Sequence, residues 1–419
     1  MERRSLIAGG LGAAVGGAVP VVDRVAAAAS GSLPRQMRSV AEFAAVGDGI
    51  ADDTSSLQAA LDATFSTTES GFLVIPPGTY KVTRPLRVAL GGASAADITR
   101  QSGILGHGAR IFSAIENGAN ILEFSSNSTV RFIVIEGLEI LGAGRDGHGI
   151  SLECDHPDKY LYNFCLRDVV VQGCGGDGCR LLGNIFEGQI INAYFRSNHG
   201  NGATFAHGKH GGILSSLHVF GSVFGDNGQH GAALVEHCYD VSFHGCYFLL
   251  NGKFGLAAEN GCTLLSNCGF ENNHAAASGF ESGDAGLYLN SFGTLVGCTA
   301  YSIFNQTKLL RAHLTGQLAM IGCTGQGGGR AKGAGLATIA GNRGGNVTLV
   351  ACTGAVEYQN GMEGIELGGR AGGIRLGSHW QSANLAQLGE YRLWVDQGGR
   401  LRLKKGPPAF DEDGAVVGS

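Results

Sequence analysis

Four polar residues stand directly before four glycines that recur through the middle of the chain. They are His148, Asp177, Asn201 and His230, and Arg180 follows the second of these glycines by two positions. Histidine gains or loses a proton near neutral pH, and a neighbouring carboxylate can fix its tautomer. A guanidinium binds a carboxylate through two parallel hydrogen bonds. Brought together, these groups would supply the acid, the base and the cation for proton transfer beside a carboxylate, so we predict His148, Asp177, Arg180 and His230 to be catalytic.

A second concentration of polar residues lies later in the same repeats. Six histidines fall between residues 199 and 237, in a chain that has 13, and the loop FAHGKHGG holds two of them. Turns favour polar residues in any case, so a solvated turn is the alternative explanation for each residue taken singly. The residues that we predict to bind substrate are Asn201, His207, Lys209, His210, Glu236 and His237.

Short strands opened by glycine are the elements that must position these side chains. Copies start at Gly149, Gly178, Gly202, Gly231, Gly255 and Gly286, at intervals of 29, 24, 29, 24 and 31 residues. In most copies the first and third residues after the glycine are apolar, which is the alternation of a strand with one buried side. The residue before each glycine and the second residue after it should then form exposed columns that run across successive repeats.

A second pattern supports the same repeat. Cys246-Tyr-Phe248-Leu-Leu-Asn251 returns 22 residues later as Cys268-Gly-Phe270-Glu-Asn-Asn273. The Phe-x-x-Asn step also occurs at residues 195–198 and 224–227. Asn suits a recurring tight turn, because it tolerates a left-handed backbone and its amide can bond the same amide one repeat away. Units this short cannot bury their apolar sides alone and must stack, so the chain is predicted to be an all-β solenoid of about ten coils.

The cysteines fit the interior of such a stack. The chain has eleven, an odd number, and five of them recur at the same place in successive repeats. Free cysteine behaves as a small apolar residue, so we predict a buried column of thiols at Cys246, Cys268, Cys298, Cys323 and Cys352. Cys174 and Cys179 have no matching second pair, which argues against a zinc site.

Composition limits the class of protein. The chain has 419 residues with 71 glycines, only 8 prolines and 44% hydrophobic residues, which excludes collagen and a disordered chain. A net charge of −5 gives no basic surface for nucleic acid, so we expect no nucleic-acid partner. Beyond the N-terminal segment no apolar run reaches the length of a transmembrane helix, so we expect no membrane contact for the mature chain.

The first residues resemble a twin-arginine export signal. Arg3-Arg4 precede a weakly hydrophobic run rich in Gly and Ala, and an Ala-x-Ala site follows at residues 27–29. An ordinary secretory signal or a membrane tether is the alternative. The resemblance implies removal of residues 1–29, a periplasmic or extracellular location, and cysteines that fold reduced.

Residues 39–90 resemble the opening of the pectate-lyase-like superfamily of right-handed parallel β-helices. The stretches SVAEFAAVGDGIADDTSSLQAALDA and GFLVIPPGTYKVTRPLRV carry this resemblance. Asp52, Asp53 and Thr54 can cap a short helix with an apolar stripe, which would cover the open end of the solenoid. The superfamily includes pectate and rhamnogalacturonan lyases, polygalacturonase-like hydrolases and phage tailspike depolymerases. The resemblance implies the fold strongly and the chemistry weakly.

Two mechanisms of that superfamily are not carried over. Polygalacturonases have Asn-Thr-Asp, Asp-Asp and Gly-His-Gly in chain order, whereas here Gly147-His148-Gly149 comes first and no Asp-Asp pair follows. Calcium-dependent lyases need several acidic ligands on neighbouring coils, and Asp146, Asp155 and Asp177 are scattered. We therefore predict no metal site and no cofactor, and calcium is not indicated.

The chain is expected to divide into four parts. The export signal at 1–29 is followed by a cap with the first strands at 30–90, the β-helix at 91–369 and a C-terminal segment at 370–419. Two alternating strands meet at Gly398-Gly399, which predicts a β-hairpin. This hairpin is either a simple cap or an oligomerisation element, and a homotrimer is the assembly that the second alternative implies.

Two functions are consistent with these features. The first is an exported lyase or hydrolase of an acidic polysaccharide, with the substrate in a lateral groove. The second is a noncatalytic solenoid that binds carbohydrate or builds an envelope structure. A binding protein should present aromatic side chains along the groove, and Tyr160, Tyr162, Tyr239 and Tyr288 are available.

Overall fold

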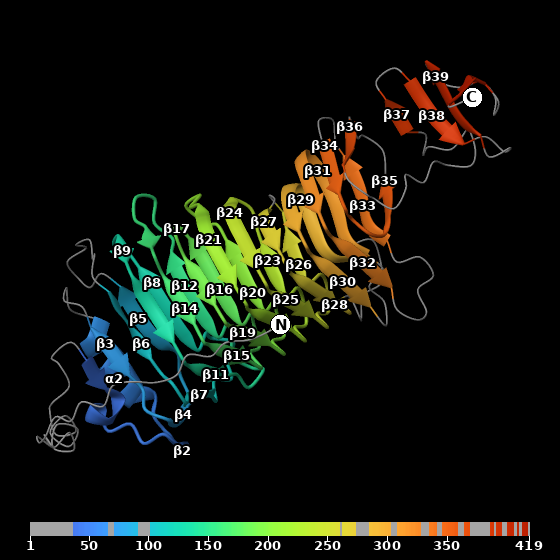
Figure 1. Cartoon of the computed structure of the whole chain (residues 1–419). Helices are drawn as coiled ribbons and strands as arrows, with labels where there is room; N and C mark the ends of the chain where they lie inside the picture. Colours follow the sequence, from blue (N-terminus) through green and yellow to red (C-terminus); the bar gives the residue numbers. More distant parts are fainter. Residues whose placement is uncertain are drawn as a thin grey trace, which may run out of the picture.

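The computed structural model shows a right-handed parallel β-helix, as predicted (Figure 1). The structure describes residues 37–65, 71–90, 101–259, 262–273, 285–302, 308–327, 335–341, 346–358, 364–368, 386–388, 391–395, 400–405, 409 and 413–417. The predicted export signal and Gly398-Gly399 lie outside the described residues. No helix of the described part is long and apolar enough to cross a membrane.

Three faces of stacked parallel strands form the rod. The first face holds the strands that follow the recurring glycines, and each pairs in register with the strand one coil away. Its strands are β5 (Leu86–Leu90), β8 (Leu122–Ser126), β12 (Ile150–Cys154), β16 (Cys179–Gly183), β20 (Ala203–Ala206), β23 (Ala232–Leu234), β26 (Leu256–Ala258), β29 (Ala285–Val296), β31 (Lys308–Ile321), β33 (Gly335–Gly341) and β35 (Ala355–Tyr358).

The second face continues the same large sheet. Strands β29 and β31 run through both faces, whereas earlier coils break between them. The strands of the second face are β1 (Met37–Ser39), β3 (Phe72–Val74), β6 (Ser102–Leu105), β10 (Ile133–Glu136), β14 (Cys165–Arg167), β18 (Gln189–Ile191), β21 (Leu214–Phe220), β24 (Cys238–His244), β27 (Cys262–Ser266), β34 (Asn346–Val350) and β36 (Gly364–Gly368). Between the two faces lie the short strands β9 (Val130–Arg131), β13 (Leu161–Tyr162) and β17 (Ile185–Phe186).

The third face is a separate sheet of eleven strands. Its strands follow the order of the sequence, one for each turn as far as residues 324–327, which agrees with the expectation of about ten coils. The strands are β2 (Asp48–Asp52), β4 (Gly78–Val82), β7 (Ala109–Ser113), β11 (Glu139–Leu141), β15 (Val170–Gln172), β19 (Tyr194–Arg196), β22 (Val223–Gly225), β25 (Tyr247–Leu249), β28 (Gly269–Glu271), β30 (Thr299–Ser302) and β32 (Thr324–Gly327).

The interior is built from columns of like residues. The rings of Phe195, Phe224, Phe248 and Phe270 stack with successive centroid separations of 5.4, 5.0 and 4.9 Å. The first residues after the glycines, such as Ile150 and Cys179, are fully buried. This confirms the inward positions predicted for the first face and explains why isolated coils could not be stable.

The Asn column is an internal hydrogen-bond ladder, as predicted. The side-chain amide of Asn198 donates to Oδ1 of Asn227 at 3.0 Å, Asn227 donates to Asn251 at 3.0 Å, and Asn251 donates to Asn273 at 2.8 Å. The left-handed backbone lies one residue earlier than expected, because positive φ occurs at positions such as Ser197 rather than at the Asn. The buried amides thus replace the hydrogen bonds that water would make.

The predicted column of thiols is confirmed for all five cysteines, which are free and at most 7% exposed. The contact with the preceding sulfur, together with burial, raises the pKa of Cys268, Cys298 and Cys323 to about 12. The pKa of Cys246 is lowered instead, because a hydrogen bond from Cys268 stabilises its thiolate. Cys174 and Cys179 are also buried and free, so they form no disulfide.

The N-terminal cap contains a 3-10 helix, η1 (Val40–Phe43), and the helix α2 (Thr54–Phe65). Leu57, Ala60 and Leu61 are at most 2% exposed and form the predicted apolar stripe. Asp52 accepts a hydrogen bond from the N–H of Thr54, and the side chain of Asp53 accepts from Val46 and Gly47. Asp53 therefore fixes the preceding loop, whereas Asp52 bonds the start of the helix.

The C-terminal strands form a four-stranded antiparallel sheet of their own. Its strands are β37 (Ala386–Leu388), β38 (Tyr391–Val395), β39 (Leu401–Lys405) and β40 (Ala415–Val416). Tyr391 pairs with Lys405 and Val395 pairs with Leu401. This is the antiparallel pairing that the alternating sequence predicts.

Candidate functional site

The polar column before the glycines of the first face is a second hydrogen-bond ladder. Each side chain accepts a hydrogen bond from the backbone N–H of the corresponding residue one coil further on. Asn120 accepts from His148 at 3.0 Å, His148 from Asp177 at 2.9 Å, Asp177 from Asn201 at 2.7 Å and Asn201 from His230 at 2.8 Å. The ladder explains why every member carries an acceptor, whatever else it does.

His148, Asp177 and Arg180 are brought together, as the sequence predicts. Nδ1 of His148 lies 3.5 Å from Oδ2 of Asp177, and its Nε2 lies 3.3 Å from a guanidinium nitrogen of Arg180. Burial lowers the pKa of His148 below its usual 6.5; the Arg180 charge lowers it further, and the Asp177 charge opposes both effects. The imidazole is thus held neutral, as a hydrogen-bond acceptor at Nδ1.

His230 is not part of that trio. Asn201 occupies the coil between Asp177 and His230, and the His230 ring stacks on Phe254 with centroids 5.7 Å apart. Nδ1 of His230 accepts from the N–H of Phe254 at 3.2 Å.

The column is also less exposed than predicted. The side chains of His148 and Asp177 are 21% and 13% exposed. Their neighbours Ser151 and Thr204 are buried, although the strand alternation points them outward.

The second concentration of polar residues gathers where strands of the first face end. His207 and His210 follow β20, Glu236 and His237 follow β23, and Asp155 follows β12. Carboxyl ends of stacked parallel strands lie at one edge of a sheet, so these loops are neighbours although they are far apart in sequence. We call this group, together with Lys209 and Tyr239, the loop cluster.

Two histidines and a tyrosine form the centre of the loop cluster. The His207 and His237 rings lie 5.1 Å apart, edge to face, and Nδ1 of His237 lies 3.2 Å from the hydroxyl of Tyr239. Nε2 of His207 lies 3.8 Å from a carboxylate oxygen of Glu236. Nδ1 of His207 is buried and has no hydrogen-bond partner among the described residues, which is unusual for a polar atom in a folded protein.

His210 pairs with Asp155 across a large sequence separation. Oδ1 of Asp155 accepts from the backbone N–H of His210 at 3.1 Å and lies 3.3 Å from its Nδ1. Burial alone would raise the pKa of Asp155, but the hydrogen bonds from His210 and Lys209 and the His210 charge outweigh it and lower the pKa. Asp155 is therefore an anion that holds the FAHGKHGG loop against the end of β12, while the side chain of Lys209 is exposed.

Two members of the loop cluster have roles that sequence reasoning missed. Tyr239 was considered only as an aromatic surface and Asp155 only as a scattered acid. Each follows a buried strand residue of the first or second face, Cys154 or Cys238. The sequence pattern that could have indicated both residues is a polar or aromatic side chain directly after a buried strand residue.

No metal site emerges from the described residues. No three His, Cys, Asp or Glu side chains gather there in a way that could hold an ion. Asp146 accepts from the backbone of Gly175, while Asp155 and Asp177 bond His210 and Asn201, so the three acids serve separate loops.

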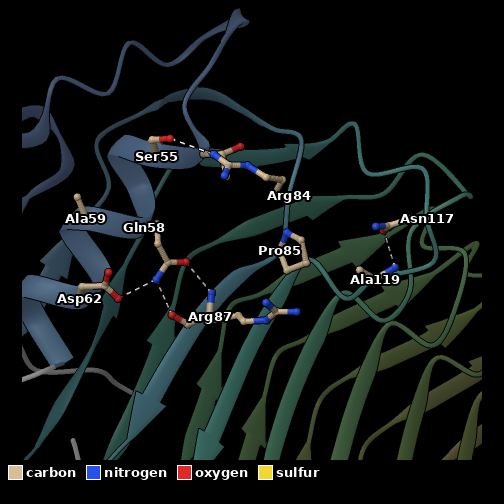
Figure 2. A pocket seen from close by; sticks show the side chains of 10 residues that line it. Ser55, Gln58, Ala59, Asp62, Arg84, Pro85, Arg87, Asn117 and Ala119 are labelled. Carbon is tan, nitrogen blue, oxygen red and sulfur yellow. Dashed lines mark hydrogen bonds between the residues drawn. The ribbon is translucent and has the colours of Figure 1, made fainter. Parts of the chain in front are cut away.

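An open pocket of about 550 Å³ lies elsewhere, between α2 and the first coil. Figure 2 shows Gln58 reaching from α2 to bond Asp62 and the backbone of Arg87, and Arg84 bonding Ser55. Most polar groups of this pocket are thus satisfied by each other. We interpret it as the joint between the cap and the solenoid.

Three protein-family models match parts of the chain, and the first two overlap at residues 117–136. Residues 37–136 match "Rhamnogalacturonase A/epimerase, pectate lyase-like", residues 117–300 match "Right handed beta helix region" and residues 337–419 match "Capsule depolymerase". Each covers less than half of the chain. Together they agree with the pectate-lyase-like, right-handed β-helix fold and relate the C-terminal part to capsule depolymerases.

Individual relatives are distant. Mannuronan C5-epimerase AlgE2 of Azotobacter vinelandii is 24% identical over 263 residues, which are 52% of this chain and 25% of that protein. The solved structure of Geobacillus virus E2 ORF18 has a TM-score of 0.54 and 18% identity, covering 88% of this chain and 66% of that one. The A-module of Azotobacter vinelandii mannuronan C-5 epimerase AlgE4 has a TM-score of 0.43 and 15% identity, covering 78% and 99%. The chain thus spans only a quarter of the curated relative that it matches.

Proposed function

We propose that the protein acts on an acidic polysaccharide by removing the proton next to a uronate carboxylate. The observation that carries this proposal is the contact between the Tyr239 hydroxyl and His237 beside the His207–Glu236 pair. A phenol and an imidazole in hydrogen-bond contact can act as acid and base in one step. The partial matches to pectate-lyase-like, epimerase and depolymerase proteins support a polysaccharide substrate.

The chemistry follows from the groups present. An imidazole of the loop cluster takes the C5 proton, and the exposed ammonium of Lys209 offsets the charge that develops on the carboxylate. Tyr239 then donates its proton to the leaving oxygen at C4, which breaks the chain by β-elimination. If a proton instead returns to C5 from the opposite side, the same first step gives epimerisation.

Hydrolysis, the other reaction predicted, fits the loop cluster less well. Glycoside hydrolysis uses two carboxyl groups that face the scissile bond from opposite sides. In the described cluster Glu236 lies against His207 and Asp155 lies against His210. Since each carboxylate already lies against a histidine, the cluster favours proton abstraction.

The trio of His148, Asp177 and Arg180 has its own place in this proposal. It lies at the opposite end of the first-face strands, and seven residues of extended chain span about 23 Å. The trio is therefore too far from the loop cluster to act in the same step, and the catalytic role predicted for His148, Asp177, Arg180 and His230 is the competing assignment.

Product analysis on defined polymers tests the proposal. The protein is incubated with polygalacturonate and polymannuronate in D₂O, and unsaturated ends, reducing ends and deuterium at C5 are measured. Unsaturated ends indicate elimination, and deuterium without chain breaks indicates epimerisation. Reducing ends without unsaturation would overturn proton abstraction in favour of hydrolysis.

A noncatalytic carbohydrate-binding solenoid is the second candidate, and the ladder on the first face favours it. The side chains of Asn120, His148, Asp177 and Asn201 all accept hydrogen bonds from backbone N–H groups, so their polar character needs no catalytic explanation. Binding of polymer without any product would support this function.

We also propose export through the twin-arginine route and assembly as a homotrimer through the C-terminal sheet. The first rests on Arg3-Arg4 and the residues that follow them, the second on the capsule-depolymerase match at residues 337–419. Replacing Arg3-Arg4 by Lys-Lys should retain the chain in the cytoplasm, and light scattering of the purified protein measures the assembly.

A further inference from the structure

Three aromatic rings form a cluster on the outside of the rod, between the first and second faces. Tyr160 and Tyr162 have ring centroids 5.7 Å apart, Tyr162 and Phe186 5.5 Å, and Tyr160 and Phe186 5.8 Å. The guanidinium of Arg131 lies 4.1 Å from the Tyr162 ring centre. We call these four residues the aromatic patch.

The strand register explains why the patch faces outward. Arg131, Tyr162 and Phe186 occupy equivalent positions on β9, β13 and β17. The residues before them in these strands, Val130, Leu161 and Ile185, are at most 1% exposed. Since side chains alternate along a strand, the rings must lie on the solvent side, where each remains partly exposed.

The same column leads into the loop cluster. Phe186 pairs with Ser215 on β21, and Ser215 pairs with Tyr239 on β24. Two steps of one coil each separate Phe186 from Tyr239, which is about 10 Å along the axis. The small side chain of Ser215, which is partly exposed, occupies the position between Phe186 and Tyr239 in this column.

We propose that the aromatic patch is a binding subsite for the same acidic polysaccharide, and that its Phe186 end lies about two sugar units away from the unit that reacts at Tyr239. This inference rests on the proposed function. The apolar side of a pyranose ring packs against the side of Phe186 that faces Ser215, and Arg131 attracts a uronate carboxylate. The polymer then runs along the axis of the rod, from the patch toward the loop cluster.

The chemistry of the patch favours this occupant over a purely structural role. Stacking of Tyr162 on Phe186 stabilises neighbouring coils, as cross-strand aromatic pairs do. Packing alone does not require a cation over the first ring or hydroxyl groups on two of the three rings. Aromatic faces with polar tips suit a ligand that is apolar on one side and hydroxylated at its edge.

Binding measurements on two variants test the subsite. Phe186→Leu keeps an apolar side chain but removes the ring face, and Arg131→Gln removes the charge. Calorimetry with polymannuronate and polygalacturonate should show affinity for the better polymer reduced about tenfold in each variant. Arg131→Gln should also weaken the dependence of affinity on salt concentration, because it removes a charge contact. Tyr301→Ala, on the third face, removes a residue that is 45% exposed and should leave affinity unchanged.

Kinetics then separate binding from folding and from the reaction itself. If turnover is observed, KM for polymer should rise in Phe186→Leu and kcat should hold. Disaccharides, which are too short to extend from the loop cluster to Phe186, should react as with the unchanged protein. If polymer binds without turnover and both variants weaken binding, the subsite stands and the proposed reaction fails. Unchanged affinity in both variants, or no binding of either polymer by the unchanged protein, overturns the subsite.

Discussion

The backbone N–H of Asp177 donates a hydrogen bond to Nδ1 of His148 at 2.9 Å, across one coil of the solenoid. Asn120 and Asn201 accept the equivalent hydrogen bonds elsewhere in the column through their amide oxygens. His148 thus occupies a position where the fold requires an acceptor. Whether it also takes part in chemistry is a separate question that substitutions can answer.

Replacing His148 distinguishes these roles. His148→Ala leaves the N–H of Asp177 without its acceptor and should cost about 1–3 kcal/mol of stability, because the group is largely removed from water. His148→Asn offers an amide oxygen, as Asn120 and Asn201 do, and should keep most of the stability. Chemical denaturation measures both. Equal loss in the two variants would contradict the acceptor role.

The pH dependence of stability gives an independent check. The folded pKa of His148 is lower than its ordinary value of 6.5, so the unfolded chain binds a proton more readily than the folded one. Stability should therefore fall as the pH drops through about 6.5 and below. His148→Asn lacks this contribution, so its melting temperature should gain on that of the unchanged protein between pH 7.5 and 5.5. A constant difference over that range would show that the imidazole titrates normally.

Substitutions in the buried Asn ladder should destabilise the protein more than substitutions of His148. Asn227→Leu removes an amide from the interior, so the backbone N–H and the side chain of Asn198 lose their shared acceptor and Asn251 loses a donor. We expect a loss of about 3 kcal/mol or more. Asn192→Gly is the matched control, because Asn192 bonds Asp168 at an exposed position and glycine tolerates its positive φ of 51°. Similar losses for both substitutions would mean that burial of the ladder is unimportant.

The fold could be predicted from the sequence because every coil of the solenoid has the same packing and hydrogen-bonding requirements. Phe248 and Phe270, or Asn251 and Asn273, meet the same packing and hydrogen-bonding need one coil apart, so each need appears as a periodic residue type. The residues of the loop cluster form no such periodic pattern in the sequence. Asp155 and His210 are 55 residues apart and meet only because β12 and β20 end at one edge of the first face. The alternation of the strand also predicts that Ser151 is exposed, and this is wrong, because Ser151 is buried although it points away from the core.

The thiol column makes a chemical prediction. Of the cysteines whose burial the structure describes, only Cys165 is partly exposed. A thiol reagent at pH 8 should therefore modify about one cysteine quickly in the folded protein, and Cys165→Ser should remove that reaction. Denatured without reductant, the chain should titrate close to all eleven thiols. Finding the five column cysteines paired in disulfides would contradict the structure.

Tyr239→Phe tests the chemistry at the loop cluster with the smallest change. The phenol is 42% exposed and contacts His237 through its hydroxyl, so its loss should leave the melting temperature nearly unchanged. If Tyr239 donates the proton to the leaving oxygen, turnover on the polymer that reacts should fall about a hundredfold or more. Tyr301→Phe on the third face is the control. The competing assignment places the reaction at His148 and Arg180, and it predicts that Tyr239→Phe keeps its activity while His148→Asn and Arg180→Ala lose theirs. Because His148→Asn preserves the ladder, a loss of turnover in that variant could not be attributed to unfolding, and the two assignments lead to opposite results.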